Sequence, residues 1–150
     1  MQLRHGPGFS VAHGASFDAL ATRHFTHPLV GRPVPGKLFL REPLAMTGVE
    51  ISLNRFAPGM AMPFLHRHRR NEEVYLFLSG DGEFQVDDEL FAIGPGSVVR
   101  VAPSATRGWR SVGEGPLDYI VLQVPHQGLQ GTGEIDDGEV VGRPPAWIRG

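Results

Sequence analysis

The sequence predicts an all-β protein, a single domain built as an antiparallel sandwich or barrel. About seven or eight short segments, spaced at roughly 8–12 residues, alternate apolar and polar side chains and are separated by turn residues. The 20 glycines and 13 prolines leave little uninterrupted chain for long helices. A length of 150 residues with a hydrophobic fraction of 41% suits one core and is too short for two ordinary domains.

The first region, residues 1–36, is expected to be an irregular arm. It is rich in Gly, His and Pro and shows no sustained alternation. Within it, residues 16–24 could form a short helix, with Ser16 as the N-cap in front of apolar residues. We expect this arm to pack on the rest of the domain or to cross to a second copy of the chain.

The second region, residues 37–126, carries the strand pattern. Apolar residues alternate in 49–56 and fill nearly every position of 73–78, as in a strand buried on both faces. The other expected strands lie between turn signals and cover 38–40, 83–86, 89–93, 97–101, 106–112 and 116–124. The last region, residues 127–150, is acidic and rich in Gly and Pro, which predicts an extended arm or disorder.

The composition excludes several classes of function. Lys and Arg number 14 against 16 Asp and Glu, and a net charge of -2 argues against a nucleic-acid surface. No apolar run approaches the ~20 residues of a transmembrane helix, and the first residues lack the apolar stretch of a signal peptide. Without cysteine there is no disulfide, thiolate nucleophile or Cys-ligated zinc. We expect a cytoplasmic protein with no nucleic-acid or membrane partner.

The strongest chemical signal is His66-Arg67-His68 followed by Glu72 and Glu73. In an extended chain, residues i and i+2 point to the same face, so His66 and His68 can converge on one ion. On a helix they would lie about 200° apart. A carboxylate from the next strand would complete a set of two imidazoles and one carboxylate, which leaves open positions on a divalent metal. Since Glu72 and Glu73 point to opposite faces of a strand, only one of them can be the ligand.

The stretch from Gly59 to Gly80 resembles the first signature of the cupin superfamily: a Gly, then His-x-His, then Glu, then Gly. The gap between Gly59 and His66 is one residue longer than is usual in the family. The spacings on either side of the glutamate match the pattern and select Glu73 over Glu72.

Gly94-Pro95-Gly96 and Pro103 resemble the start of the second cupin signature, so that the resemblance covers roughly residues 48–123. It implies a small single-domain cupin of the cupin 2 type, an antiparallel double-stranded β-helix or jelly-roll barrel spanning residues 37–126. It also implies that His66, His68 and Glu73 are metal ligands.

The second signature departs from the family pattern at its last ligand. The family usually has a histidine at the position of Arg107 and an asparagine at the position of Ser111. A guanidinium cannot lose its proton and so cannot be a ligand. Two interpretations stay open. Either the metal keeps three ligands while Arg107 binds an anionic group of the substrate, or Arg107 pairs with Glu73 and the pocket holds no metal.

The walls of the pocket follow from side chains that share a face with these groups. Tyr75 and Phe77 continue the face of Glu73, and Trp109 shares the face of Arg107. The expected substrate-binding residues are Arg107, Trp109, Tyr75, Phe77 and Gln123, with Tyr119 beside Gln123.

The resemblance implies a metal-dependent cupin that acts on or binds a small anionic organic molecule, dioxygenase-like or isomerase-like, with no single reaction selected. The ion would be Fe(II), Mn(II), Ni(II) or Zn(II), because imidazole and carboxylate suit all four. The alternative is a metal-free cupin that binds or senses a small molecule and has no catalytic activity. A third candidate, a metal-independent isomerase of phosphorylated or nucleotide-linked sugars, would have only His66 and His68 as its base. A homodimer is expected in each case.

Overall fold

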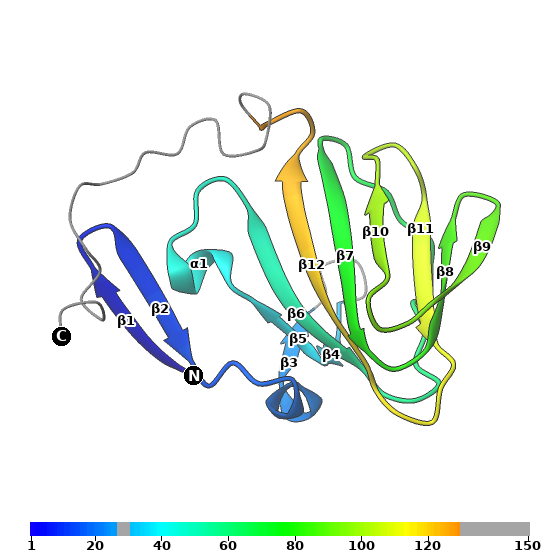
Figure 1. Ribbon diagram of the computed structural model, residues 1–150, viewed down its shortest axis with the longest axis horizontal. Helices are drawn as coiled ribbons and strands as arrows, with labels where there is room; N and C mark the ends of the chain where they lie inside the picture. Colours follow the sequence, from blue (N-terminus) through cyan, green and yellow to red (C-terminus); the bar gives the residue numbers. More distant parts are fainter. Residues whose placement is uncertain (27–30, 130–150) are drawn as a thin grey trace, which may run out of the picture.

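The computed structural model describes residues 1–26 and 31–129, and two antiparallel sheets dominate it (Figure 1). The larger sheet has the strand order β10-β7-β12-β6-β5 and the smaller one the order β11-β8-β9. The strands of the larger sheet are β5 (Lys37–Phe39), β6 (Glu50–Phe56), β7 (Asn71–Ser79), β10 (Val98–Val101) and β12 (Leu117–Pro125). Those of the smaller sheet are β8 (Gly82–Val86), β9 (Glu89–Ile93) and β11 (Arg107–Ser111). The predicted all-β fold is confirmed.

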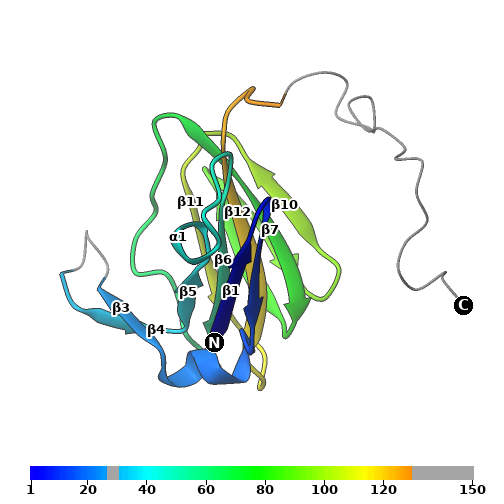
Figure 2. The ribbon, with the colours of Figure 1, turned by 90° about the vertical axis from the view of Figure 1, so that its left-hand side faces the viewer.

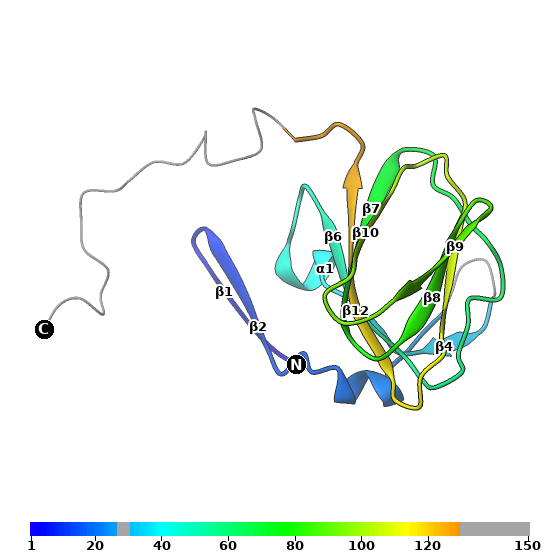
Figure 3. The same ribbon diagram turned by 45° about the vertical axis from the view of Figure 1, so that its right-hand side comes forward.

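The two sheets face each other across a core of aromatic rings (Figure 3). Alternation along β7 turns Tyr75 and Phe77 inward, where Phe84 of β8 and Trp109 of β11 meet them. The ring centroid of Tyr75 lies 4.9 Å from that of Phe84 and 5.0 Å from that of Trp109, in edge-to-face contacts. Each such pair adds about 0.5–1.5 kcal/mol beyond simple burial. The core therefore begins directly beneath the residues predicted to bind metal.

The outer face of β7 corrects the prediction of a strand buried on both faces. The inward Tyr75 and Phe77 are buried, whereas Val74 and Leu76 are half-buried and Leu78 is 46% exposed. An antiparallel sheet of this kind needs only one face on the core. The apolar residues on the outer side of β7 thus do not mark a second buried layer.

The N-terminal segment, expected to be irregular, contains short regular elements. The strands β1 (Gln2–Gly6) and β2 (Phe9–His13) form a hairpin that lies beside the barrel and contacts the short helix α1 (Arg41–Leu44) (Figure 2). Two further short strands, β3 (His24–Thr26) and β4 (Pro33–Pro35), pair with each other.

The helix expected near Ser16 is present as a single 3-10 turn, η1 (Asp18–Thr22). The Ser16 hydroxyl accepts a hydrogen bond of 3.3 Å from the Ala19 amide. Leu20 of this turn is 1% exposed and packs with Leu38 and Leu53, which belong to β5 and β6. The segment therefore covers part of the larger sheet, as one of the two expected placements of the arm requires.

The division into an arm, a barrel and a tail stays a prediction, and the tail lies outside the described residues from position 130 onward. In the part of the chain that is described, no helix is long and apolar enough to cross a membrane.

Candidate metal centre

The two histidines lie on the connection between β6 and β7, and main-chain hydrogen bonds fasten this connection to the smaller sheet. The amide of His66 donates to the carbonyl of Arg107 at 3.0 Å, and the amide of Arg107 donates back to His66 at 2.8 Å. The amide of His68 donates to the carbonyl of Pro103 at 3.0 Å. The chain here is extended, so that His66 and His68 share a face as their spacing predicts.

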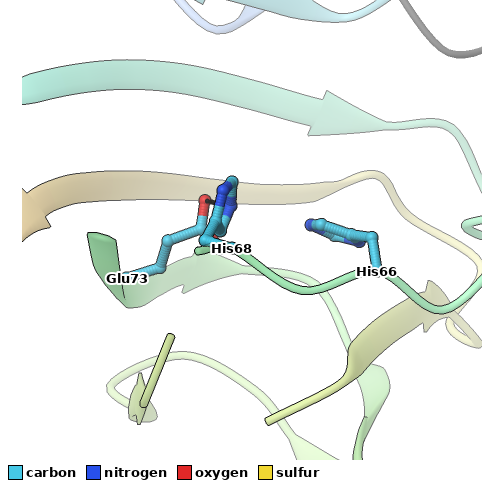
Figure 4. A group of neighbouring side chains, drawn as sticks. All are labelled: His66, His68 and Glu73. Atoms are coloured by element: carbon cyan, nitrogen blue, oxygen red, sulfur yellow. Dashed lines mark ion pairs between the residues drawn. The ribbon is translucent and has the colours of Figure 1, made fainter. Parts of the chain in front are cut away.

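His66, His68 and Glu73 come together at one point of the barrel wall (Figure 4). One nitrogen of each imidazole and one oxygen of the carboxylate all lie within 4.8 Å of one another. Glu72 points the other way, where its carboxylate accepts a hydrogen bond of 2.9 Å from Nε of Arg100. The register that selected Glu73 over Glu72 is therefore the one that the strand adopts.

Four groups surround the carboxylate of Glu73, which is buried. Oε1 lies 3.1 Å from Nε2 of His68 and accepts a hydrogen bond of 3.1 Å from the amide of Gln123. Oε2 accepts a hydrogen bond from the hydroxyl of Tyr75 and lies 3.3 Å from Nε of Arg107. Burial raises the pKa of Glu73, but the hydrogen bonds from His68 and Tyr75 outweigh it and bring the pKa to about 2. The carboxylate is thus ionised at neutral pH.

His66 is held neutral. Burial is the largest cause that lowers its pKa to about 4, the charge of Arg107 lowers it further, and the charge of Glu73 opposes both. Its Nδ1 atom is buried and has no hydrogen-bond partner among the described residues. Neutral imidazole and ionised carboxylate are the forms that bind a divalent transition metal. The donor set therefore fits such an ion.

Arg107 lies behind the carboxylate of Glu73, with a side chain that is 0% exposed. Its Nη1 donates to the carbonyl of Ala105 at 3.1 Å, while Nε and Nη2 make no hydrogen bond within the described ranges. The contact with Glu73 expected for a metal-free pocket is thus present. The side chain does not line the cavity, so the geometry gives no support to the expectation that Arg107 binds substrate.

A cavity of about 640 Å³ opens beside the three ligand residues. Of the other expected pocket residues, Tyr75, Trp109 and Gln123 line it, and so does Tyr119, whose hydroxyl accepts a hydrogen bond of 2.9 Å from Trp109. Phe77 does not line the cavity, because it is packed in the core with 1% exposure. The volume is within the range of small-molecule sites.

Besides the exposed Arg32 and Arg67, the sequence reasoning missed two polar residues that line the cavity, Lys37 and Asn54. They lie opposite each other on β5 and β6. A lysine at the start of an apolar strand was the available signal, since it is the only lysine in the chain.

Comparison with known proteins connects this barrel with one family. The family described as "Cupin domain" matches residues 52–123. A crystal structure of a cupin protein from Bacteroides fragilis is 34% identical, covers 70% of this chain and 88% of its own, and superposes with a TM-score of 0.66. An uncharacterized protein of Methanocaldococcus jannaschii is 29% identical over 87 residues, which is 57% of this chain and 70% of that protein.

A more distant solved structure supports the fold alone. It is a sugar phosphate isomerase from a cupin superfamily of Silicibacter pomeroyi, 18% identical, with a TM-score of 0.54 and 59% of each chain covered.

Proposed function

The chain belongs to the cupin family, and on that premise we propose that it is a metal-dependent protein whose barrel pocket binds and acts on a small anionic organic molecule. The observation that supports this most is the convergence of His66, His68 and Glu73 within 4.8 Å at the wall of the cavity. Two imidazoles and one carboxylate leave open positions on a divalent ion.

Fe(II), Mn(II), Ni(II) or Zn(II) would suit these donors, and such an ion would supply Lewis-acid chemistry toward a substrate oxygen or dioxygen. Tyr75 and Gln123 hold the carboxylate of Glu73 in place through hydrogen bonds, which fixes the direction of its lone pairs. Trp109 and Tyr119 form an apolar wall that limits the access of water to the reacting group. The reaction class we propose is dioxygenase-like or isomerase-like.

Metal analysis tests this proposal directly. Protein purified without an affinity tag or added metal should contain about one equivalent of a transition metal, and His68→Ala should lose it. His13→Ala is the matched control, since His13 is exposed and distant from the site in the sequence. Metal retained in His68→Ala at the level of the control would contradict the ligand assignment.

A metal-free binding or sensing cupin is the second candidate. The observation that favours it is the 3.3 Å approach of Arg107 to Glu73, which already compensates the buried carboxylate. Under this alternative, the thermal midpoint is unchanged by a chelator and no metal is taken up after anaerobic addition of Fe(II) and Mn(II). A midpoint that falls with the chelator and recovers with one of these ions counts against it.

The expected homodimer and cytoplasmic location stay predictions. Light scattering of the purified chain tests the first, and subcellular fractionation tests the second.

A further inference from the structure

Lys37 lies on the inner side of the larger sheet, at its edge strand β5. In the register of the sheet, Lys37 faces Asn54 of β6, and Asn54 faces Tyr119 of β12. Residues directly opposite each other on neighbouring strands project to the same face. All three line the cavity, and Lys37 is half-buried there. The only lysine of the chain therefore projects into the proposed ligand pocket.

Among the described residues, the ammonium group of Lys37 has no anionic partner. Within residues 1–26 and 31–129 it makes no hydrogen bond or ion pair, and its Nζ lies 4.9 Å from the ring centroid of Phe39. Burial lowers the pKa of Lys37 to about 8, although the charges of Glu73 and Glu50 act in the opposite direction. A poorly solvated cation that lacks a partner is costly, and an incoming anion would relieve that cost.

Glu73 forms no ion pair with Lys37, and its two oxygens contact four other groups. It is also the only acidic residue among the described side chains that line the cavity. Three cationic residues line the same cavity, namely Lys37 inside it and the exposed Arg32 and Arg67. The pocket thus carries an excess of positive charge, which complements an anionic ligand.

The rest of the cavity wall is apolar and rich in rings. The aromatic residues on it are Phe25, Phe39, Phe56, Phe64, Tyr75, Trp109 and Tyr119. Such a wall favours a flat or apolar ligand body, since aromatic side chains bury large area and stack on rings.

We propose that Lys37 binds the carboxylate or phosphate group of a ligand whose apolar or aromatic body packs against this wall. The inference deepens the proposed function and rests on the barrel pocket being the ligand site. It does not depend on a bound metal. It assigns to Lys37 the anion-binding role that the sequence suggested for Arg107, whose side chain lies outside the cavity.

The single lysine makes the test specific. Reductive methylation with ¹³C-formaldehyde labels Lys37 and the terminal α-amine and keeps the charge of both. Two sets of methyl signals then report on the pocket and on a reference amine. Benzoate, phenyl phosphate and inorganic phosphate serve as anionic probes, and benzyl alcohol is the uncharged probe.

Benzoate or phenyl phosphate should shift the Lys37 signal saturably and leave the α-amine signal in place, and the stronger of the two identifies the anionic group. In calorimetry, Lys37→Met should bind that probe about tenfold more weakly or worse, while Arg23→Met should bind it like the wild type. Arg23 is an exposed arginine that does not line the cavity. An unmoved Lys37 signal at the highest soluble concentration of all three anions, or equal affinity in Lys37→Met, would overturn the inference.

Chelator-treated and metal-loaded protein should both be titrated. If the protein takes up no metal but an anion still shifts the Lys37 signal, the metal-dependent function is refuted and the role of Lys37 stands. If the protein takes up metal but no anion shifts the Lys37 signal, the role of Lys37 is refuted and the metal-dependent function stands.

Discussion

Replacing Lys37 by methionine should stabilise the metal-free protein at neutral pH. The wild type keeps a half-buried ammonium in the cavity with no ion-pair partner among the described residues. Methionine retains the apolar stem of the lysine and has no charge to desolvate. The variant thus removes the unfavourable free energy of desolvating this ammonium, which the folded wild-type chain retains at its pocket.

The size and the pH window of this cost follow from the pKa of Lys37, which burial lowers from 10.5 to about 8. Each pH unit corresponds to about 1.4 kcal/mol, which gives about 3 kcal/mol in total. Between pH 8 and 10.5 the unfolded chain binds more protons than the folded one, so the free energy of unfolding of the wild type rises with pH there. The cost is fully present below pH 8 and is gone above 10.5. Loss of the contact with the Phe39 ring offsets about 0.5–1 kcal/mol of the gain.

Urea unfolding of chelator-treated protein measures the difference. At pH 7, Lys37→Met should exceed the wild type by about 2 kcal/mol, and this advantage should shrink as the pH rises through the window. Arg23→Met removes an exposed positive charge and should show no such pH-dependent gain. A wild type at least as stable as Lys37→Met at pH 7, or a difference that stays constant with pH, would refute the reasoning.

Three further substitutions test the scaffold and the site. Gly36→Ala should lower the free energy of unfolding by more than about 2 kcal/mol, because Gly36 has a φ of +88° and a Cβ there would lie well inside 3.0 Å of the Arg55 carbonyl oxygen. Gly59→Ala, with a φ of +74° and nothing within 4 Å, should cost about 1 kcal/mol, and equal urea midpoints for the two variants would contradict the steric argument. Arg107→His should raise metal affinity about tenfold in competition with a chelator by adding a fourth donor, whereas weaker binding would show that the pairing with Glu73 matters more.

Much of the site could be predicted because its information is local. The spacing of His66 and His68 fixes their common face in any extended chain, and strand alternation separates Glu72 from Glu73. Strand alternation does not predict which of the inward-facing residues line the cavity and which are packed in the core. Tyr75 and Phe77 share a face, yet Tyr75 lines the cavity and Phe77 is packed beneath it.

The features of the site that sequence reasoning did not anticipate depend on contacts between distant segments. Lys37 lines the pocket because β5 pairs with β6. The sequence of a strand of only three residues does not predict which strand it pairs with. The guanidinium of Arg107 lies outside the cavity, where it pairs with Glu73 and donates a hydrogen bond to the carbonyl of Ala105. In the N-terminal segment a signal was present: Gly6-Pro7-Gly8 is a turn sequence between two stretches that pair as β1 and β2.

The pair of main-chain hydrogen bonds between His66 and Arg107 has a consequence for how such a barrel can evolve. The amide and the carbonyl of residue 107 form two main-chain hydrogen bonds with His66, and any residue other than proline can supply both; Nη1 of Arg107 adds a third, at 3.5 Å, to the carbonyl of His66. The main-chain part of this attachment therefore persists when the side chain at position 107 is changed. Replacing arginine by histidine there exchanges a cation for a metal-donor group. A change at this one position could therefore alter how strongly the barrel holds a metal ion, without rebuilding the scaffold that carries His66, His68 and Glu73.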